Sequence, residues 1–207
     1  FFFKQKTAYE ISTRDWSSDV CSSDLSMGAL IGMGLAALPD APVRKMVMND
    51  VGPTLNYEAL SRIGRYIGED VRFDSFQQAR TYIRTISAPF GPHTEQEWDK
   101  LAADVLRQTD DGRWRRHYDL ALALPFKAMT QETAQQGEAA LWAAYDAVRC
   151  PVLLVRGSES DLLTRETAQQ MASRGPRARL VELPGIGHAP TFMHDDQIAL
   201  ARAFFLE

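Results

Sequence analysis

Two apolar segments joined by one amphipathic segment constrain the fold of this chain more than any other feature. The segments are CPVLLVRG at 150–157 and ARLVELPG at 178–185. The first is apolar through its centre, as is typical of a parallel strand buried on both faces. Between the two, Thr164 can cap a helix over TRETAQQMASRG and Gly175 can end it. The pattern predicts a strand–helix–strand unit and therefore a parallel α/β sheet.

The chain upstream and downstream of this unit extends the same pattern. The run SMGALIGMGLAAL at 26–38 predicts a helix buried against the sheet, and VRKMVMND at 43–50 predicts a strand with a polar exit. The end of the chain, DDQIALARAFFLE, predicts a last helix capped by Asp195 or Asp196. Residues 26–53 and 149–207 are therefore expected to form the sheet-bearing core.

The middle of the chain, residues 54–148, has a different texture and is almost all helix by its pattern. Asn56 and Asp74 are placed to cap helices, and Thr94 with Glu97 matches a capping box. A helical block inserted between strands of a parallel sheet is expected to form a cap over the carboxyl ends of the strands, where ligands bind in such sheets.

The first segment, residues 1–25, shares no periodicity with the rest of the chain. Its strings KQKTAYEI and DWSSDVCSSDL resemble in-frame translations of the two ends of a sequencing-library adapter. This resemblance implies that the segment is not native, that Leu25 holds the junction, and that native sequence begins at about Ser26. A genuine N-terminal arm is the alternative.

Composition narrows the possible partners. No run of eighteen apolar residues is present, and the arginines are scattered among acids in a chain with a formal charge of −4, which argues against a nucleic-acid or membrane partner. The two cysteines build neither a disulfide framework nor a metal site, and no histidine has metal-ligand spacing around it. We expect a small-molecule substrate, no metal or organic cofactor and, by default, a cytoplasmic location, while the oligomeric state is left open.

Three polar residues stand where predicted strands end: Ser26, Asp161 and His188. Because parallel strands all exit at the same edge of a sheet, we expect these side chains to meet. A serine hydroxyl becomes a nucleophile when an imidazole takes its proton and a carboxylate orients that imidazole. Two alternatives are weighed: Ser26 as a simple helix N-cap, and Glu159 as the carboxylate in place of Asp161.

This order of residues resembles the α/β-hydrolase family. The elbow is represented by SMG, the acid loop by GSESDLL, the histidine loop by GIGHAP, and the family's helical cap by LNYEAL onward. The resemblance implies that Ser26 is the nucleophile, His188 the general base and Asp161 the orienting carboxylate, with the backbone N–H of Met27 as an oxyanion donor. Aromatic residues of the cap are candidates to line the substrate pocket, although most such residues pack helices together; the candidates are Trp98, Trp114 and Trp142.

One departure from the family pattern affects activity. The elbow reads G-x-S-x-G; Gly28 supplies the second glycine, but Asp24 stands at the position of the first. The second oxyanion donor of the family also comes from a loop upstream of the nucleophile. We therefore expect the chain as written to be nearly inactive and its uncontaminated parent to be active.

The implied function is a serine hydrolase that cleaves a small ester, lactone or thioester through an acyl-enzyme. Hydrolysis of carbon–carbon bonds in ring-cleavage products is one alternative, and a non-catalytic binding protein on the same fold is another. Likeness of fold does not choose among them.

Overall fold

The core of the protein is a four-stranded parallel sheet. We describe residues 20–207 of a computed structural model. The strand order is β1-β2-β6-β7, and all neighbours are parallel. The strands are β1 (Val20–Leu25), β2 (Val43–Asn49), β6 (Val152–Gly157) and β7 (Arg179–Leu183). The parallel sheet expected from the sequence is thus present.

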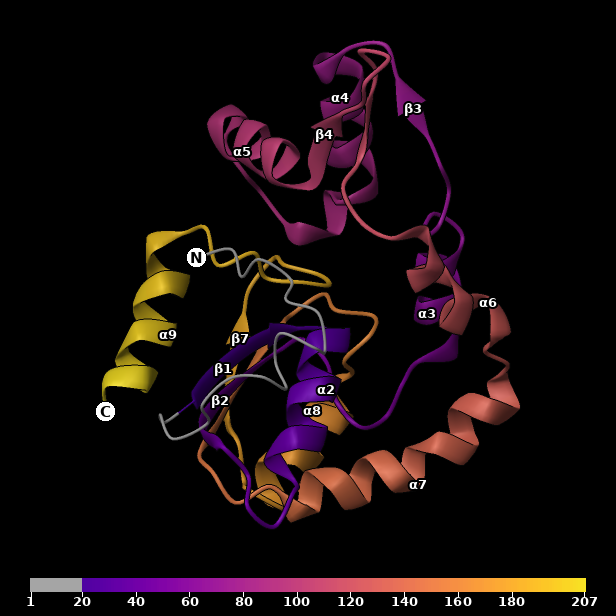
Figure 1. Cartoon of the computed structure of the whole chain (residues 1–207). Helices are drawn as coiled ribbons and strands as arrows, with labels where there is room; N and C mark the ends of the chain where they lie inside the picture. The colour runs from indigo at the N-terminus through magenta and orange to yellow at the C-terminus, as the bar shows by residue number, and fades with distance from the viewer. Residues whose placement is uncertain (1–19) are drawn as a thin grey trace.

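Helices cover both faces of this sheet (Figure 1), as a parallel sheet requires. On one face lie α2 (Met27–Ala36), α7 (Gln131–Ala147) and α8 (Arg165–Ser173), and on the other lies α9 (Asp195–Leu206). Alternate side chains of β2 serve the two layers: Met46 and Met48 belong to the cluster with α2, α7 and α8, whereas Val47 packs with Phe204 of α9. The period of two in a strand therefore builds two hydrophobic layers around one sheet.

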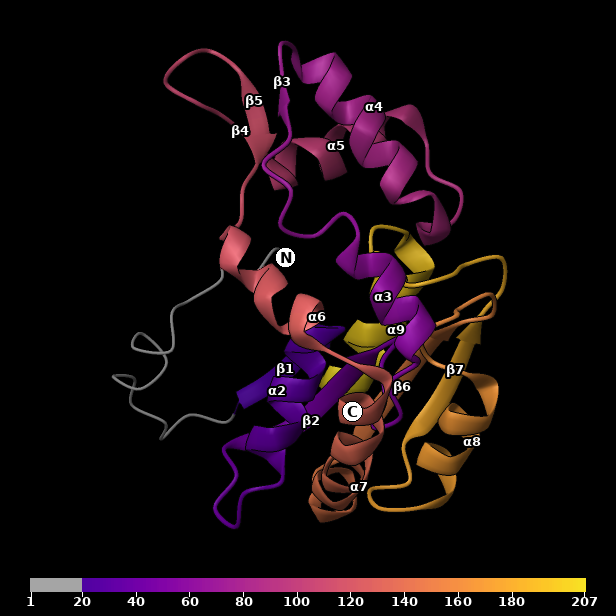
Figure 2. The same ribbon diagram turned by 90° about the vertical axis from the view of Figure 1, so that its right-hand side faces the viewer.

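The segment between β2 and α7 lies outside the parallel sheet, and we refer to it as the cap (Figure 2). Its helices include α3 (Tyr57–Gly64), α4 (Phe76–Ile86), α5 (Glu95–Val105) and α6 (Leu124–Ala128), with short 3-10 turns η1 (Ala88–Phe90) and η2 (Leu120–Ala123). It also contains an antiparallel sheet in the order β3-β5-β4, made by β3 (Arg72–Phe73), β4 (Leu106–Gln108) and β5 (Trp114–Arg116). The prediction of an almost entirely helical cap is wrong in this respect.

The last predicted cap helix, α7, belongs to the core layer rather than to the cap. Its side chains Trp142 and Tyr145 are part of the hydrophobic cluster on the sheet, and the Tyr145 hydroxyl donates to the carbonyl of Met171 in α8 at 2.6 Å. The outer cap has a small core of its own around Ala79, Ile83, Ala102 and Leu106. The cap boundary therefore falls before α7.

Most of the predicted helix starts are confirmed. The side chains of Asn56 and Thr164 accept from the backbone three residues on, and Thr94 with Glu97 forms the expected capping box. The prediction of Asp74 is wrong by one residue, because Ser75 accepts from Gln78 N. Neither Asp195 nor Asp196 is the N-cap residue. Both lie in the first turn of α9, where the helix dipole attracts a carboxylate. Within residues 20–207, no helix has the length and apolarity to cross a membrane.

The last residues of the first segment form a strand of the sheet. Residues 20–25 form β1, which runs parallel to β2 with Leu25 opposite Asn49. Pairing along a strand edge uses backbone N–H and C=O groups, so an extended segment of almost any sequence can satisfy it. The assignment of the segment as non-native stays a prediction, and for residues 1–19 it lies outside the described part of the chain.

Candidate active site

Ser26 occupies a strained turn between β1 and α2. Its backbone angles are φ 51° and ψ −113°, a combination that costs free energy in any residue with a Cβ. Ser26 stands at the N-cap position of α2, as the alternative interpretation expected, but its side chain makes no capping hydrogen bond. A serine held on a strained strand-to-helix turn is the geometry of a nucleophile elbow, in which the hydroxyl is presented away from the helix.

The N-terminus of α2 offers backbone N–H groups beside this serine. Met27 is the first residue of the helix, where N–H groups have no partner within the helix. Within the described part of the chain, no hydrogen bond engages Met27 N–H, and Met27 is 38% exposed. An anion next to Ser26 would meet this donor and the positive end of the helix dipole.

His188 contacts a buried carboxylate that the sequence analysis did not consider. Its Nδ1 lies 2.9 Å from Oδ2 of Asp50, and the side chains of His188 and Asp50 are 9% and 0% exposed. Asp50 directly follows β2, as Ser26 directly follows β1, and the last residues of these two strands are register partners. The three residues Ser26, Asp50 and His188 therefore all belong to turns at the same edge of the sheet.

The carboxylate of Asp50 is held by two further donors. Oδ1 accepts from Gly157 N at 2.9 Å, and Oδ2 accepts from Ser160 Oγ at 2.6 Å. The Ser160 hydroxyl in turn accepts from Leu163 N at 3.1 Å, which directs its own proton toward Asp50. A buried carboxylate with this set of donors is fixed in place and can orient an imidazole.

Asp161 does not occupy the position predicted for it. It forms a bidentate ion pair with Arg62 of α3, with atom separations of 2.7 to 3.1 Å, and its side chain is 50% exposed. Glu159, the other acid weighed, is also exposed. The assignment of Asp161 as the residue that orients His188 is thus wrong in this structure. An aspartate follows each of two neighbouring strands, directly after β2 and four residues after β6, and the one after β2 is the buried one.

Two glycines allow the histidine loop to lie against the end of β6. A Cβ on Gly157 would come within 2.3 Å of the carbonyl oxygen of Ile186, and one on Gly187 would come within 2.9 Å of that of Pro89. Hydrogen bonds use the close approach, since Glu159 N donates to Ile186 O and Gly187 N donates to Pro89 O. The second of these bonds connects Gly187, the residue before His188, to Pro89 of the cap.

No hydrogen bond joins the Ser26 hydroxyl to His188 among the described residues, and Nε2 of His188 has no hydrogen-bond partner there. Catalytic hydrogen bonds of this kind are often long in enzymes without substrate and shorten when substrate binds. The atom of His188 that would accept a proton is therefore available, while its other nitrogen is engaged by Asp50.

The three tryptophans proposed as pocket residues are packing residues in this structure. Trp142 is buried in the core cluster and its Nε1 donates to Thr54 and Glu138. Trp114 packs edge-on against Phe76 inside the cap. Trp98 is buried, but its ring lies 5.0 Å from that of His93, whose Nε2 is 2.8 Å from Thr191 Oγ1 in the histidine loop. Of the three, Trp98 is the one that is connected to the histidine loop, through His93.

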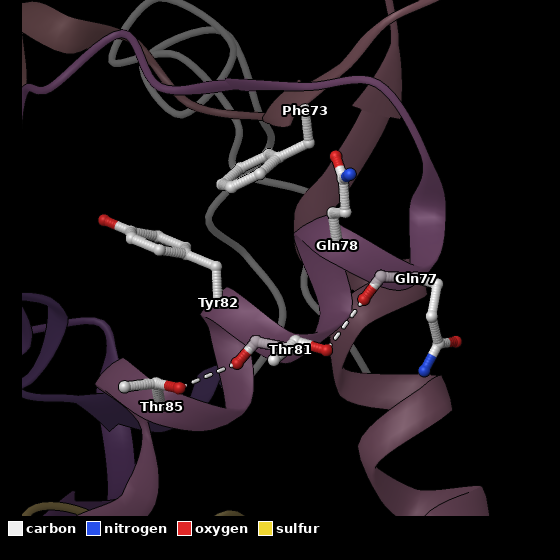
Figure 3. Close-up of a pocket in the computed structure, with 6 residues that line it drawn as sticks. All are labelled: Phe73, Gln77, Gln78, Thr81, Tyr82 and Thr85. Carbon is white, nitrogen blue, oxygen red and sulfur yellow. Dashed lines mark hydrogen bonds between the residues drawn. The ribbon is translucent and has the colours of Figure 1, made fainter.

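A hollow of about 480 Å³ lies along α4, away from this site. Phe73 and Tyr82 line it, with their ring centroids 5.1 Å apart (Figure 3). None of Ser26, Asp50 and His188 lines it. Within residues 20–207, no group of three or more histidine, cysteine or acidic residues is placed to hold a metal ion.

A serine on a strained elbow, a helix N-terminus beside it and an imidazole–carboxylate pair at the same sheet edge define a class of α/β proteins built for nucleophilic catalysis. The chain belongs to the alpha/beta hydrolase family, whose model matches residues 25–203. The family expected from the sequence motifs is thereby confirmed.

Individual relatives are similar over most of this chain. It is 52% identical over 183 residues to a protein of Cupriavidus necator named 3-hydroxybutyrate-oligomer hydrolase, covering 87% of this chain and 62% of that protein. Among solved structures, an alpha/beta hydrolase from Novosphingobium aromaticivorans superposes with a TM-score of 0.76 at 34% identity, covering 89% of this chain and 65% of that one. A Rickettsia typhi structure has a TM-score of 0.76 at 28% identity, covering 88% and 60% of the two chains. The chain therefore spans less than two thirds of the length of these relatives.

Proposed function

We propose that this chain is part of an enzyme that hydrolyses carboxylic esters, with Ser26 as the nucleophile, His188 as the general base and Asp50 as the carboxylate that orients His188. The observation that carries the proposal is the contact of 2.9 Å between His188 Nδ1 and the fully buried Asp50, at the same sheet edge as a strained Ser26. Asp50 replaces Asp161 in the role that the family resemblance implies.

The proposed reaction follows from these positions. Nε2 of His188 takes the proton of the Ser26 hydroxyl as its oxygen attacks the ester carbonyl, and Asp50 stabilises the imidazolium that forms. The carbonyl oxygen becomes an oxyanion, to which the N–H of Met27 can donate a hydrogen bond. The positive end of the α2 helix dipole also stabilises this negative charge. His188 then gives its proton to the leaving alcohol, and water activated by His188 releases the acid from Ser26.

The second oxyanion donor is expected to come from sequence upstream of Ser26 in the parent protein, as the family resemblance implies. Removal of one such donor costs about 10²- to 10³-fold in rate in known enzymes. We therefore predict that the chain as written has little activity and that its parent, with native sequence before Ser26, is active.

The substrate class that we propose is a short oligomer of a hydroxy acid. Its support is the 52% identity to the Cupriavidus necator protein named 3-hydroxybutyrate-oligomer hydrolase. The same acyl-enzyme chemistry acts on simple esters, lactones and thioesters, so activity on a small neutral ester is also expected. No feature of the site favours carbon–carbon bond hydrolysis or a purely binding role over this.

Active-site labelling tests the proposal. A fluorophosphonate probe should label the parent protein at Ser26, and labelling should vanish in Ser26→Ala. It should persist in the control Ser173→Ala, whose exposed hydroxyl donates to the carbonyl of Gln170 in α8. A panel of p-nitrophenyl butyrate, a lactone and hydroxybutyrate dimers and trimers then ranks the substrates. An unlabelled parent that turns over none of these esters would favour the binding-protein alternative.

A further inference from the structure

A second cavity lies between the cap helices α3 and α6 and takes no part in the chemistry proposed above. Its volume is about 240 Å³. Its lining combines apolar walls, two hydroxyl groups and two cationic side chains, and includes Tyr57, Leu60, Ser61, Arg65, Phe126 and Lys127. The polar part of this lining is larger than the apolar part, so the cavity suits a charged or polar group with a short apolar contact beside it.

The charge of this lining is one-sided. Arg65 and Lys127 both line the cavity, and no acidic side chain does. Within residues 20–207, neither cation takes part in an ion pair, whereas Arg62, one turn earlier on α3, is neutralised by Asp161. Glu58 also lies on α3 but outside the lining. The cavity is therefore a local positive site in a chain with a formal charge of −4.

The cavity lies at the base of the cap, where α3 and α6 meet the core layer. Phe126 and Met129, which line it, also pack against the core cluster that includes Ala29, a residue of α2 three positions after Ser26. Arg62 of α3 reaches Asp161 just past the end of β6. In Figure 2, α3 and α6 lie between the sheet and the outer helices α4 and α5.

We infer that this cavity binds the terminal carboxylate of an oligo-ester substrate, with Arg65 and Lys127 holding the charge. The inference rests on the proposed function and assigns the end group that the enzyme selects. A hydroxy-acid oligomer carries one carboxylate at its end, along a chain of methyl, methylene and ester groups. Arg65 and Lys127 can bind the carboxylate, because charge-assisted hydrogen bonds to a carboxylate are strong. Leu60 and Phe126 can contact the methyl and methylene groups of the chain.

The test compares two substrates that differ in this end group alone: a 3-hydroxybutyrate trimer as its free acid and the same trimer as its methyl ester. The measured quantity is the ratio of kcat/KM for the free acid to that for the methyl ester, in the parent protein. The test variant is Arg65→Gln/Lys127→Gln. The matched control is Arg107→Gln/Arg202→Gln, which removes the same charge from exposed positions on β4 and α9.

We expect the ratio to fall by about tenfold or more in the test variant, mostly through the KM of the free acid, and to stay the same in the control. In the unmodified parent, KM for the free acid alone should rise as salt is increased from about 0.05 to 0.5 M, because ions screen the exposed cations. This salt measurement keeps the inference testable if the double variant does not fold.

Two results would contradict the inference in different ways. Hydrolysis of both trimers with an unchanged ratio, and with no difference in salt dependence, would overturn the carboxylate site and leave the esterase function intact. Failure of the unmodified parent to hydrolyse either trimer or p-nitrophenyl butyrate would overturn the proposed function and the inference with it.

Discussion

Replacement of Asp50 by Asn distinguishes the structure-based assignment from the sequence-based one. The Asp50 carboxylate accepts three hydrogen bonds, from His188, Ser160 and Gly157. An Asn side chain has one oxygen and one NH₂ group. In one orientation the NH₂ faces the N–H of Gly157, and in the other it faces Ser160 and His188, so a donor always faces a donor. If the NH₂ faces His188, the imidazole must carry its proton on Nε2 and cannot accept the Ser26 proton.

The expected loss is large. The equivalent change in a well-studied serine protease lowers kcat by about 10⁴-fold through the wrong tautomer, which corresponds to about 5 kcal/mol of transition-state stabilisation at 1.36 kcal/mol per tenfold. We expect Asp50→Asn in the parent protein to lose on the order of 10³- to 10⁴-fold in kcat on p-nitrophenyl butyrate.

Asp161→Asn is the matched control, since it makes the same chemical change one strand away. Its carboxylate is half exposed and pairs with Arg62, whose side chain is 36% exposed. Exposed ion pairs contribute about 0–1 kcal/mol, so we expect a small decrease in melting temperature and a change in kcat of less than about threefold. Thermal melting by circular dichroism checks that both variants are folded.

The reasoning would be refuted by the opposite pattern. If folded Asp161→Asn lost about 10²-fold or more while Asp50→Asn kept most of its activity, Asp161 would be the orienting carboxylate after all. The Asp50–His188 contact would then be a property of the free enzyme alone.

Three further predictions concern the groups around this site and the stability of the fold. Ser160→Ala removes one donor to Asp50, and we expect kcat to fall by about 10-fold with little change in KM, because a hydrogen bond to a charged group contributes about 1.5–3 kcal/mol. Tyr145→Phe removes the bond to Met171 O and should cost about 1 kcal/mol in urea unfolding. Burial raises the pKa of Tyr145, so an unfolded tyrosine ionises first and stability falls as the pH rises above about 10; that slope should be shallower in the Phe variant. Thr94→Ala breaks the capping box of α5 and should cost about 1 kcal/mol at pH 7. Hydrogen bonds from Thr94 lower the pKa of Glu97, so this stabilisation is present above the ordinary glutamate pKa of 4.5 and shrinks as the pH falls below it. Urea unfolding curves at pH 7 and at a pH below 4.5 measure the difference.

Local signals explain which parts of the fold were predictable. The capping residues Asn56, Thr94 and Thr164 act within one turn of their own helix, so the sequence contains the whole interaction. The cap sheet was missed because its strands have two or three residues each and pair across distant positions, with Phe73 opposite Trp114. Two or three residues are too few to show an alternating pattern, so the antiparallel pairing is decided by tertiary contacts.

The same distinction explains why the sequence points to Ser26 and His188 as candidate site residues and not to Asp50. A small-residue turn before a buried helix and a histidine between glycine and alanine-proline are local patterns with few structural uses. An aspartate after a strand is a common pattern with many structural uses, and this chain has one after β2 and another after β6. What separates them is depth: Asp50 is completely buried beneath Gly157 and Ser160, while Asp161, one residue beyond Ser160, turns outward to Arg62. The side of the turn that faces the histidine is set by the packing of two loops, Gly157 against Ile186, and a linear pattern of residues does not encode that contact.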